Sequence, residues 1–363
     1  QASSRFPAAP PRSRSPFPIQ PRPASDMSLS RPNVPCLMGE WRRPHNDLQQ
    51  QVVGGGHKAI HDDATAQAVG FAAAPIHGTV HWSQFTPLFL QGFGQEWFET
   101  GSISVHFKTM VTHMQPVRAF MAKPDPSKKA QMVDIWMEHV DGRVVFEGTA
   151  SVGLKPGEMV SKVQQQIQAI KPVKKPLLFE RKALGTKTTT KEPMSIGWKG
   201  LVHPSAFPFT LEKKLEIITE YHPWFAKESG KKSPWGRPIL PPECLNAVML
   251  QGLEPQRWPR IPAEEWLGKA MGGRTPVGLF GACEVVLHSG PVFPDEPYEL
   301  TRELVGKGET PRAEFNWVRT YLTEKSTGKL VAEMTLQSMM MKAGFEGYED
   351  LRTKAAGEPA AKL

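Results

Sequence analysis

The chain has 363 residues, enough for two ordinary domains or for one architecture that is repeated. With 39% hydrophobic residues and ten tryptophans it can bury a substantial core, yet no apolar run approaches the roughly 18 residues that a membrane-spanning helix requires. The three cysteines, Cys36, Cys244 and Cys283, are too few and too scattered for a disulfide framework or a zinc site, which is usual in a reducing compartment.

The formal net charge of +8 invites comparison with nucleic-acid-binding proteins, so its location matters. Two segments hold the basic excess: five arginines accompany only Asp26 in residues 1–34, and ten basic residues accompany three acidic ones in residues 155–199. Neither segment contains an RNA-binding motif, a zinc knuckle or a basic helix with interleaved aromatic residues. We therefore expect no nucleic-acid partner.

Both ends of the chain have the composition of tails. Residues 1–35 are rich in Pro, Arg and Ser without hydrophobic periodicity, which predicts disorder. This composition is compatible with part of a transit peptide, or with a tail that precedes a start at Met27. Residues 346–363 form a second expected tail that ends in Ala361-Lys362-Leu363, close to the Ser-Lys-Leu peroxisomal signal. We expect a peroxisomal location, with a mitochondrial or cytoplasmic one as the alternatives.

Residues 36–155 are predicted to form one compact unit. Within it, a polar His61-Asp62-Asp63 step leads into an alanine-rich helical run, which stops at Gly70-Phe71 before Pro75-Ile76-His77-Gly78 opens a second helix. The tight turn between the two helices should bring His61 near the His77-Gly78 turn. Strand-like runs follow at residues 102–111, 116–123, 130–140 and 143–153. A helix followed by an antiparallel meander indicates a sheet wrapped around one long helix.

The rest of the chain repeats this plan. Residues 156–200 are rich in Lys, Thr and Pro and are predicted to be a basic connector with one helix. In the second unit, residues 201–345, Pro238-Ile239 stands where Pro75-Ile76 stands, and an apolar helix again ends in Leu-Gln-Gly. A glycine-led strand and a long hairpin follow in the same order as before. The series indicates a divergent duplication.

The order of residues after Gly56 resembles a known family. His61, Asp63, an alanine-containing helix, Gly70-Phe71 and Ile76-His77-Gly78 follow one another as in the hydratase segment of the MaoC-like, R-specific enoyl-CoA hydratases. The resemblance covers most of residues 36–342 and implies an α+β double hot-dog fold, two units of a long helix wrapped by an antiparallel sheet. The chain departs from the family where its leading catalytic Asp aligns with Gly56 and its Asn-Pro with Lys58-Ala59.

Hydration of an enoyl thioester needs a base for the water, an acid for the α-carbon and donors for the carbonyl oxygen. The resemblance implies that His61 is the base and that the Gly78 N–H, at the start of the central helix, is the carbonyl donor. Asp63, His57 and Glu220 are the candidates for the missing carboxylate function; Glu220 stands where the second unit would carry the family's Asp. His77 either takes part in catalysis or anchors the turn.

Other residues have two interpretations each. Asp62 or Asp63 also suits the N-cap of the alanine-rich helix. His81 lies one turn beyond His77 and is a candidate substrate contact; a metal pair of the two lacks an acidic or cysteine partner in the sequence, so we expect no metal. Trp224 and Phe225 are expected to line the acyl chain from the second unit.

The sequence thus predicts a MaoC-like lyase, a hydratase or dehydratase, that acts on an acyl thioester or a related small-molecule acyl intermediate. Two alternatives stay open: a hot-dog isomerase, cyclase or thioesterase of a biosynthetic pathway, and a catalytically silent acyl-binding protein. We expect no cofactor and no membrane span, and allow for a homodimer.

Overall fold

The computed structural model of the protein describes residues 31, 33–53, 57–68, 70–155, 157–158, 160–171, 173, 176–178, 183–188, 191–203, 207–250, 277–342, 345 and 347–357. Most of the expected N-terminal tail, the second Leu-Gln-Gly triplet beyond Leu250, and Ala361-Lys362-Leu363 lie outside these residues. Within the described ranges, none of the helices is both long and apolar enough to span a membrane.

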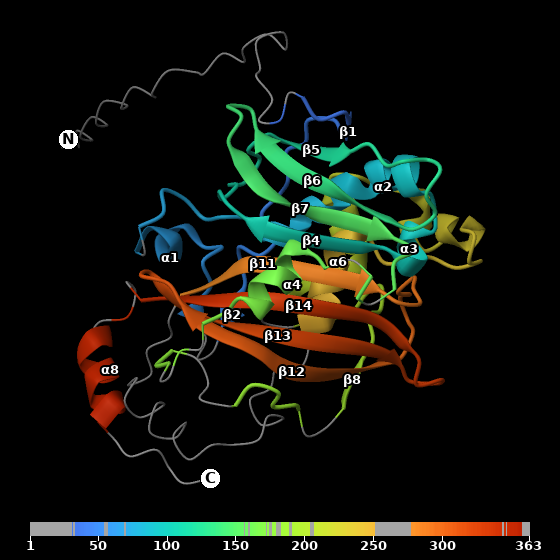
Figure 1. The fold of residues 1–363 in the computed structure, drawn as a ribbon. Helices are drawn as coiled ribbons and strands as arrows, with labels where there is room; N and C mark the ends of the chain where they lie inside the picture. The colour runs from blue at the N-terminus through green and yellow to red at the C-terminus, as the bar shows by residue number, and fades with distance from the viewer. Residues whose placement is uncertain are drawn as a thin grey trace, which may run out of the picture.

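Ten antiparallel strands form one continuous sheet in the order β1-β5-β6-β7-β4-β11-β14-β13-β12-β8 (Figure 1). The strands of the first half are β1 (Cys36–Met38), β4 (Ser102–Phe107), β5 (Val117–Ala122), β6 (Gln131–His139) and β7 (Val144–Val152). Those of the second half are β8 (Glu192–Met194), β11 (Gly278–Leu287), β12 (Tyr298–Glu309), β13 (Ala313–Glu324) and β14 (Leu330–Met341). Each half contributes five neighbouring strands, so the sheet divides into two similar units.

The two units meet where β4 pairs with β11, with Val105 opposite Cys283 and Ile103 opposite Val285. These four side chains are almost fully buried and belong to one hydrophobic core that extends through both halves. Because successive side chains of a strand point to opposite faces, this register directs the same face of both half-sheets towards the helices. The seam is therefore part of the core.

Central helices pack on that face of the sheet. In the first half, the 3₁₀ helix η3 (Gly78–Phe85) continues into α2 (Thr86–Phe93), and in the second half α6 (Pro242–Leu250) packs against η3. The sequence predicts one long helix from Gly78, whereas the structure divides it at Thr86-Pro87. Pro87 has no N–H to donate to the preceding turn, which accounts for a break at this point. Two helices wrapped by two joined antiparallel sheets make a double hot-dog fold.

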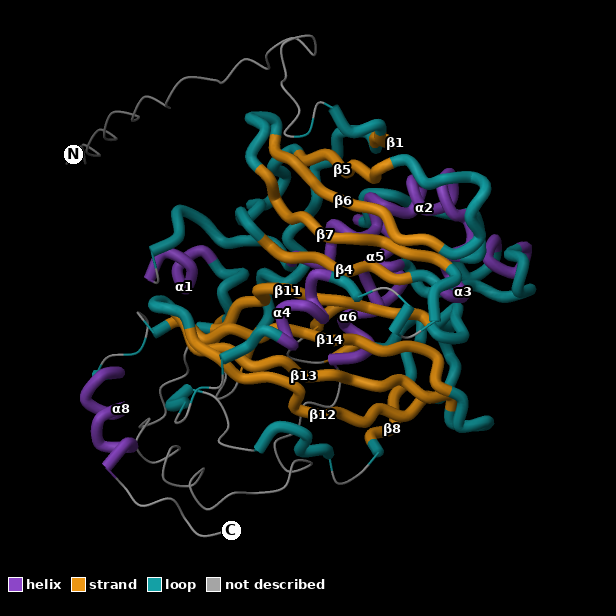
Figure 2. Tube along the Cα trace, in the orientation of Figure 1, coloured by secondary structure: helices purple, strands orange, loops and turns teal. Residues whose placement is uncertain are grey.

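Shorter elements surround the sheet and its central helices (Figure 2). They are β2 (Val52–Val53), β3 (His57–Lys58), α1 (Asp63–Ala68), α3 (Trp97–Thr100), α4 (Lys162–Gln168), β9 (Leu201–His203), β10 (Phe207–Thr210), α5 (Leu211–Ile217), η4 (Pro223–Phe225), η5 (Ser229–Lys232) and α8 (Tyr348–Gly357). Of these, α5 lies on the side of α6. Helix α4 crosses the seam on the face opposite η3, where Val163 packs with Ala282 and Trp317. The connector thus supplies both α4 and the edge strand β8.

The expected C-terminal tail, residues 346–363, contains the helix α8, which corrects that prediction. Its Tyr348 hydroxyl donates to the buried Glu314 carboxylate at 2.6 Å, and the two terminal nitrogens of Arg352 bind Glu309 at 2.7 and 2.8 Å. Tyr348 also packs with Leu177 and Leu178. These contacts with the second half-sheet explain why a polar, non-periodic segment forms a fixed helix.

The other expected tail is anchored at its end. Arg31 pairs with Asp134 at 3.1 Å and with Glu147 at 2.9 Å, and its guanidinium lies 5.0 Å from the centre of the Trp136 ring. Strand β1 then begins at Cys36 and pairs with β5. Within residues 1–35, Arg31 is therefore not part of a free tail, because its side chain contacts the sheet.

Candidate active site

The loop that carries His61 is held by the two aspartates that follow it. Oδ2 of Asp62 accepts a hydrogen bond from the backbone N–H of Thr65 at 3.1 Å, which makes Asp62 the N-cap of α1. Oδ1 of Asp63 accepts from the backbone N–H of Ala74 at 2.8 Å. The first aspartate starts the helix, and the second fixes the His61 loop to the segment that leads to His77.

His61 and His77 lie side by side, as the tight turn between the two helical runs predicts. Their ring centres are 5.9 Å apart with the ring planes at 74°, and only 8% and 7% of the two residues is exposed. Nδ1 of His61 lies 2.6 Å from the carbonyl oxygen of Pro75. Because a carbonyl oxygen can only accept, Nδ1 carries the proton and Nε2 is the basic nitrogen of the neutral ring. We call these two residues the histidine pair.

The second half of the chain encloses the histidine pair. The ring of His77 makes edge contacts with Phe207 of β10 at 5.9 Å and with Phe280 of β11 at 5.3 Å. Phe280 lies at a β-bulge, since the pairing of β11 with β14 shifts between Phe280 and Ala282. A bulge reverses the face to which the preceding side chains point, which brings Phe280 to the helix side of the sheet. This wall of the site could not be assigned from the sequence pattern.

Gly78 begins η3 directly beyond His77. A Cβ atom at this position would lie 2.5 Å from the Phe107 ring, so a glycine is required by the close approach of that ring. His77 makes no side-chain hydrogen bond to cap the helix. The first N–H groups of a helix have no acceptor within it, and here no side-chain cap supplies one. The helix start therefore presents N–H donors next to the histidine pair.

Burial keeps both imidazoles uncharged at neutral pH. Burial and, to a smaller extent, the neighbouring His61 lower the pKa of His77 to about 3, against the opposing effect of Asp47. Burial likewise lowers the pKa of His61, while the Pro75 carbonyl and Asp47 raise it in part. Nδ1 of His77 lies 2.8 Å from the Thr79 hydroxyl, and its Nε2, although buried, has no hydrogen-bond partner among the described residues.

Asp47 and Lys214 are functional candidates that the sequence reasoning missed. Asp47, in the loop before β2, forms an ion pair with Lys214 of α5, and Nζ of Lys214 lies 2.6 Å from Oε1 of Glu243 in the first turn of α6. All three side chains are at most 4% exposed. Asp47 is separated from Lys214 by 167 residues, and neither belongs to a recognisable motif. We call Asp47, Lys214 and Glu243 the charged cluster.

Other predicted site residues have different surroundings. Oε1 of Glu220 binds Nε of Arg42 at 2.6 Å. His81 is buried with its ring 6.3 Å from that of Phe146, and its Nδ1 lies 3.4 Å from Nε2 of Gln84. His57 lies in β3, paired with Val53 of β2. Among the described side chains, no hydrogen bond, ion pair or ring contact joins Glu220 or His81 to the histidine pair, although His81 slightly lowers the pKa of His77.

Trp224 and Phe225 lie in an aromatic cluster around Phe98 of α3. Their rings are 5.9 and 6.4 Å from that of Phe98, and Trp235 completes the cluster. Among the described residues, no ring contact joins Trp224 or Phe225 to the histidine pair, and their role as a lining for the acyl chain stays a prediction.

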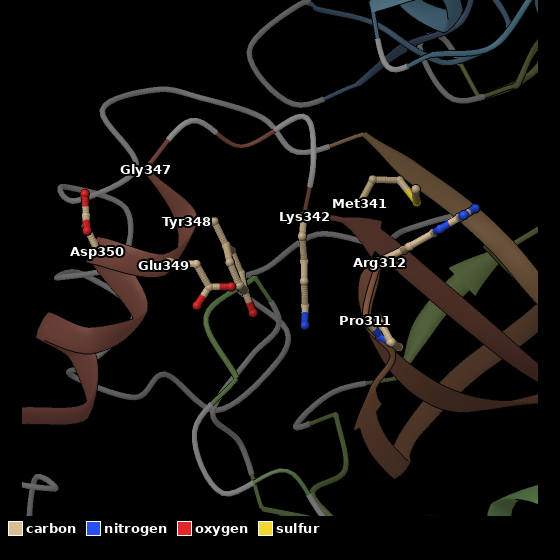
Figure 3. Close-up of a pocket in the computed structure, with 8 residues that line it drawn as sticks. All are labelled: Pro311, Arg312, Met341, Lys342, Gly347, Tyr348, Glu349 and Asp350. Carbon is tan, nitrogen blue, oxygen red and sulfur yellow. The ribbon is translucent and has the colours of Figure 1, made fainter.

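A surface groove of about 670 Å³ lies elsewhere, between α8 and the ends of β13 and β14 (Figure 3). Figure 3 shows Tyr348 beside Lys342, whose ammonium lies 5.3 Å from the tyrosine ring. The lining of the groove includes Arg312, Met341 and Glu349, and it contains none of the predicted site residues. Among the residues that the structure describes, no group of three or more His, Cys, Asp or Glu side chains could hold a metal ion.

Several solved structures are similar to this chain. A putative MaoC domain protein dehydratase from Chloroflexus aurantiacus shares 12% identity over 90% of this chain and 99% of its own, with a TM-score of 0.49. A conserved hypothetical protein from Mycobacterium tuberculosis with a double hot-dog fold shares 12% identity over 87% and 97%, with a TM-score of 0.46. A putative thioesterase from Novosphingobium aromaticivorans shares 15% over 83% and 95%, with a TM-score of 0.39. No protein-family model and no curated protein matches the sequence.

Proposed function

We propose that the protein is a hydro-lyase for acyl thioesters and that His61 transfers the proton. The hydrogen bond between Nδ1 of His61 and the Pro75 carbonyl carries this proposal, because it determines which ring nitrogen is basic. Burial lowers the pKa of His61, so the basic form is present at neutral pH. A neutral, oriented imidazole can act as the base, and the uncapped helical N–H groups beside it can stabilise the negative charge that develops on the carbonyl oxygen.

In the hydration direction, Nε2 of His61 removes a proton from water while the water oxygen bonds to the β-carbon of an enoyl thioester. The electrons of the carbon–carbon double bond move towards the thioester oxygen, which accepts from the Gly78 N–H. The proton on His61 then passes to the α-carbon. One water hydrogen remains on the new hydroxyl and the other is on carbon, so the atoms balance.

His77 has a second role in this reaction. When the Thr79 hydroxyl donates to Nδ1 of His77, the ring proton is on Nε2, the atom without a hydrogen-bond partner among the described residues. Burial lowers the pKa of His77 to about 3, so this ring donates as a neutral imidazole and does not compete with His61 for a proton. The Nε2–H group of His77 and the backbone N–H of Gly78 would then both donate hydrogen bonds to the thioester oxygen.

The test is turnover of a short enoyl-CoA such as crotonyl-CoA, followed by loss of the enoyl-thioester absorbance. His61→Asn keeps an N–H donor for the Pro75 carbonyl but removes Nε2, and we expect it to lower kcat by about two to four decades. His81→Asn is the matched control, since it removes a buried imidazole that contacts Phe146 and Gln84 and should retain turnover.

Two results would overturn the proposal. The first is a folded His61→Asn variant with unchanged turnover, which would remove His61 from the chemistry. The second is wild-type protein that binds the thioester without converting it, or that releases free CoA with no hydrated product. The latter outcomes would favour an acyl-binding protein and a thioesterase, respectively.

A further inference from the structure

The charged cluster joins three separate segments inside the protein. Asp47 belongs to the loop before β2, Lys214 to α5 and Glu243 to α6, and each residue is at most 4% exposed at its side chain. A buried ammonium that contacts two carboxyl groups can neutralise only one of them. Burial raises the pKa of Glu243 despite the adjacent Lys214, whereas Lys214 outweighs burial at Asp47 and lowers its pKa. Lys214 thus favours the charged form of Asp47, whereas burial favours the neutral form of Glu243.

Asp47 lies close enough to the histidine pair for its charge to act on both rings. The neighbouring Asn46 donates from Nδ2 to the backbone carbonyl of His61 at 2.9 Å, which ties this loop to the His61 loop. The charge of Asp47 raises the pKa of both His61 and His77 against the effect of burial. Oδ1 of Asp47 makes no hydrogen bond to another described residue. Nε2 of His77 likewise has no hydrogen-bond partner among the described residues. Only one oxygen of Asp47 is thus used by Lys214.

We infer that Asp47 supplies the carboxylate function of this site, and that Lys214 holds it beside the histidine pair from the second half of the chain. Asp47 is a positioning residue that acts through His61, and the inference rests on the proposed function of His61. Asp47 takes this role in place of Asp63 and Glu220, because their carboxylates have other partners. The Asp63 carboxylate accepts a hydrogen bond from the Ala74 N–H, and the Glu220 carboxylate pairs with Arg42. When His61 accepts a proton from water, the Asp47 charge stabilises the imidazolium in a site from which water is largely excluded.

The charged groups around Asp47 determine the direction in which it shifts the pKa values of the two histidines. Lys214 approaches from α5, Glu243 and Cys244 from α6, His61 from the loop before α1, and His77 from the turn before η3. Burial raises the pKa of the Cys244 thiol, so this group is neutral. Lys214 is therefore the one cation in this set, and it lowers the pKa of His77.

Two substitutions in one ion pair should move the acid limb of kcat in the same direction. Asp47→Asn removes the charge that favours the His61 imidazolium, so the midpoint moves to lower pH and kcat falls about a hundredfold, at the low end for loss of a proton-transfer group. Lys214→Met removes the cation that lowers the pKa of Asp47, so this carboxyl group takes up a proton more readily and the midpoint again moves to lower pH. Lys213→Met is the control, since Lys213 is exposed and pairs only with Glu216.

A readout independent of turnover separates this inference from the proposed function. The ring protons of His61 can be titrated by NMR in the full-length protein, and Asp47→Asn should lower the midpoint by at least half a pH unit, roughly the size expected for loss of one nearby charge. Circular dichroism reports whether each variant is folded. If Lys214→Met does not fold, Asp47→Asn alone decides the question.

Unchanged NMR and kinetic midpoints in a folded Asp47→Asn variant would overturn the inference and leave the role of His61 intact. A midpoint that moves to higher pH in Lys214→Met would also overturn it, since Lys214 would then not be the group that keeps Asp47 ionised. A wild-type protein without turnover but with the NMR shift would overturn the proposed function and retain the coupling of Asp47 to His61.

Discussion

The two halves of the chain share one architecture and differ in what their central helices bury. The first helix begins beside His77 and buries a row of polar side chains at Thr79, His81, Ser83 and Gln84. The second, α6, begins at Pro242 with the buried Glu243 and carries no histidine. The first half thus holds the groups that can transfer protons, while the second provides Phe207, Phe280 and Lys214 around them. The two halves thus share a fold, while the second half encloses side chains that the first half contributes.

The largest expected effect comes from the ion pair that connects the halves. Lys214→Met leaves the buried Asp47 carboxylate without its counter-charge, which should reduce the free energy of unfolding by about 3–5 kcal/mol. Lys213→Met, one residue away and 72% exposed at its side chain, should change it by about 0.5 kcal/mol or less. Denaturant unfolding measures both. Equal effects of the two substitutions would contradict a link between the halves at Lys214.

The close contact at the start of the first helix should give a smaller effect. Gly78→Ala places a methyl group 2.5 Å from the Phe107 ring, and such overpacking costs about 1–3 kcal/mol. Gly39→Ala is the control, because its methyl group would meet Ala119 at an ordinary 3.5 Å. Replacing Phe107 by Leu in the Gly78→Ala variant should restore part of the stability. Without such rescue, the Phe107 ring is not what requires a glycine.

Acid should destabilise the first half before the second. Folding lowers the pKa of His61, His77 and His81 through burial, to about 3 for the latter two. Below the ordinary value of about 6.5 the unfolded chain binds protons that the folded chain does not. Stability should therefore fall as the pH decreases from about 6.5 towards 3, by up to about 1.4 kcal/mol per pH unit for each histidine.

Hydrogen exchange at pH 7 and pH 5 locates this effect. Earlier loss of protection around η3 and α2 than in β12 to β14 would agree with the asymmetry of the halves. Uniform loss over both half-sheets would indicate that the buried histidines do not control acid unfolding.

The smallest expected effects on stability and kcat come from the two aspartates of the His61 loop, since we expect neither to take part in catalysis. Asp63→Asn retains an oxygen that can accept from the Ala74 N–H, so stability should change by about 1 kcal/mol or less and kcat by a few-fold at most. Asp62→Ala removes the cap of α1 and should cost about 1 kcal/mol. A loss of two decades in kcat for Asp63→Asn would instead restore Asp63 as the catalytic carboxylate.

The sequence predicts the meeting of His61 and His77 because a short helix and a glycine stop connect them, and local geometry then determines their distance. The division of the unit into a helix and a meander follows from hydrophobic periodicity in the same way. Even the break of the first helix has a local cause in Pro87. Features determined within about 20 residues were accessible without a structure.

The remaining parts of the site depend on pairings between distant segments. The contact of Asp47 with Lys214 requires α5 to pack beside the loop before β2, and no pattern around either residue indicates this. Phe280 faces His77 only because the bulge at Gly281 changes the register of β11. The expected roles of Trp224 and Phe225 required their position relative to the helix axis, which spacing along the chain does not give. Tertiary register, and not residue type, was the missing information.

The seam between β4 and β11 has a consequence for solubility. Strands of six and ten residues would each expose a long row of unpaired backbone groups if the halves were separate, and long exposed edges pair with other molecules. Joining them leaves only β1 and β8 at the borders of the sheet, with three residues each. Pro193, in the middle of β8, further removes a backbone donor from that border. Pairing β4 with β11 in one chain thereby hides two strand edges that separate units would expose.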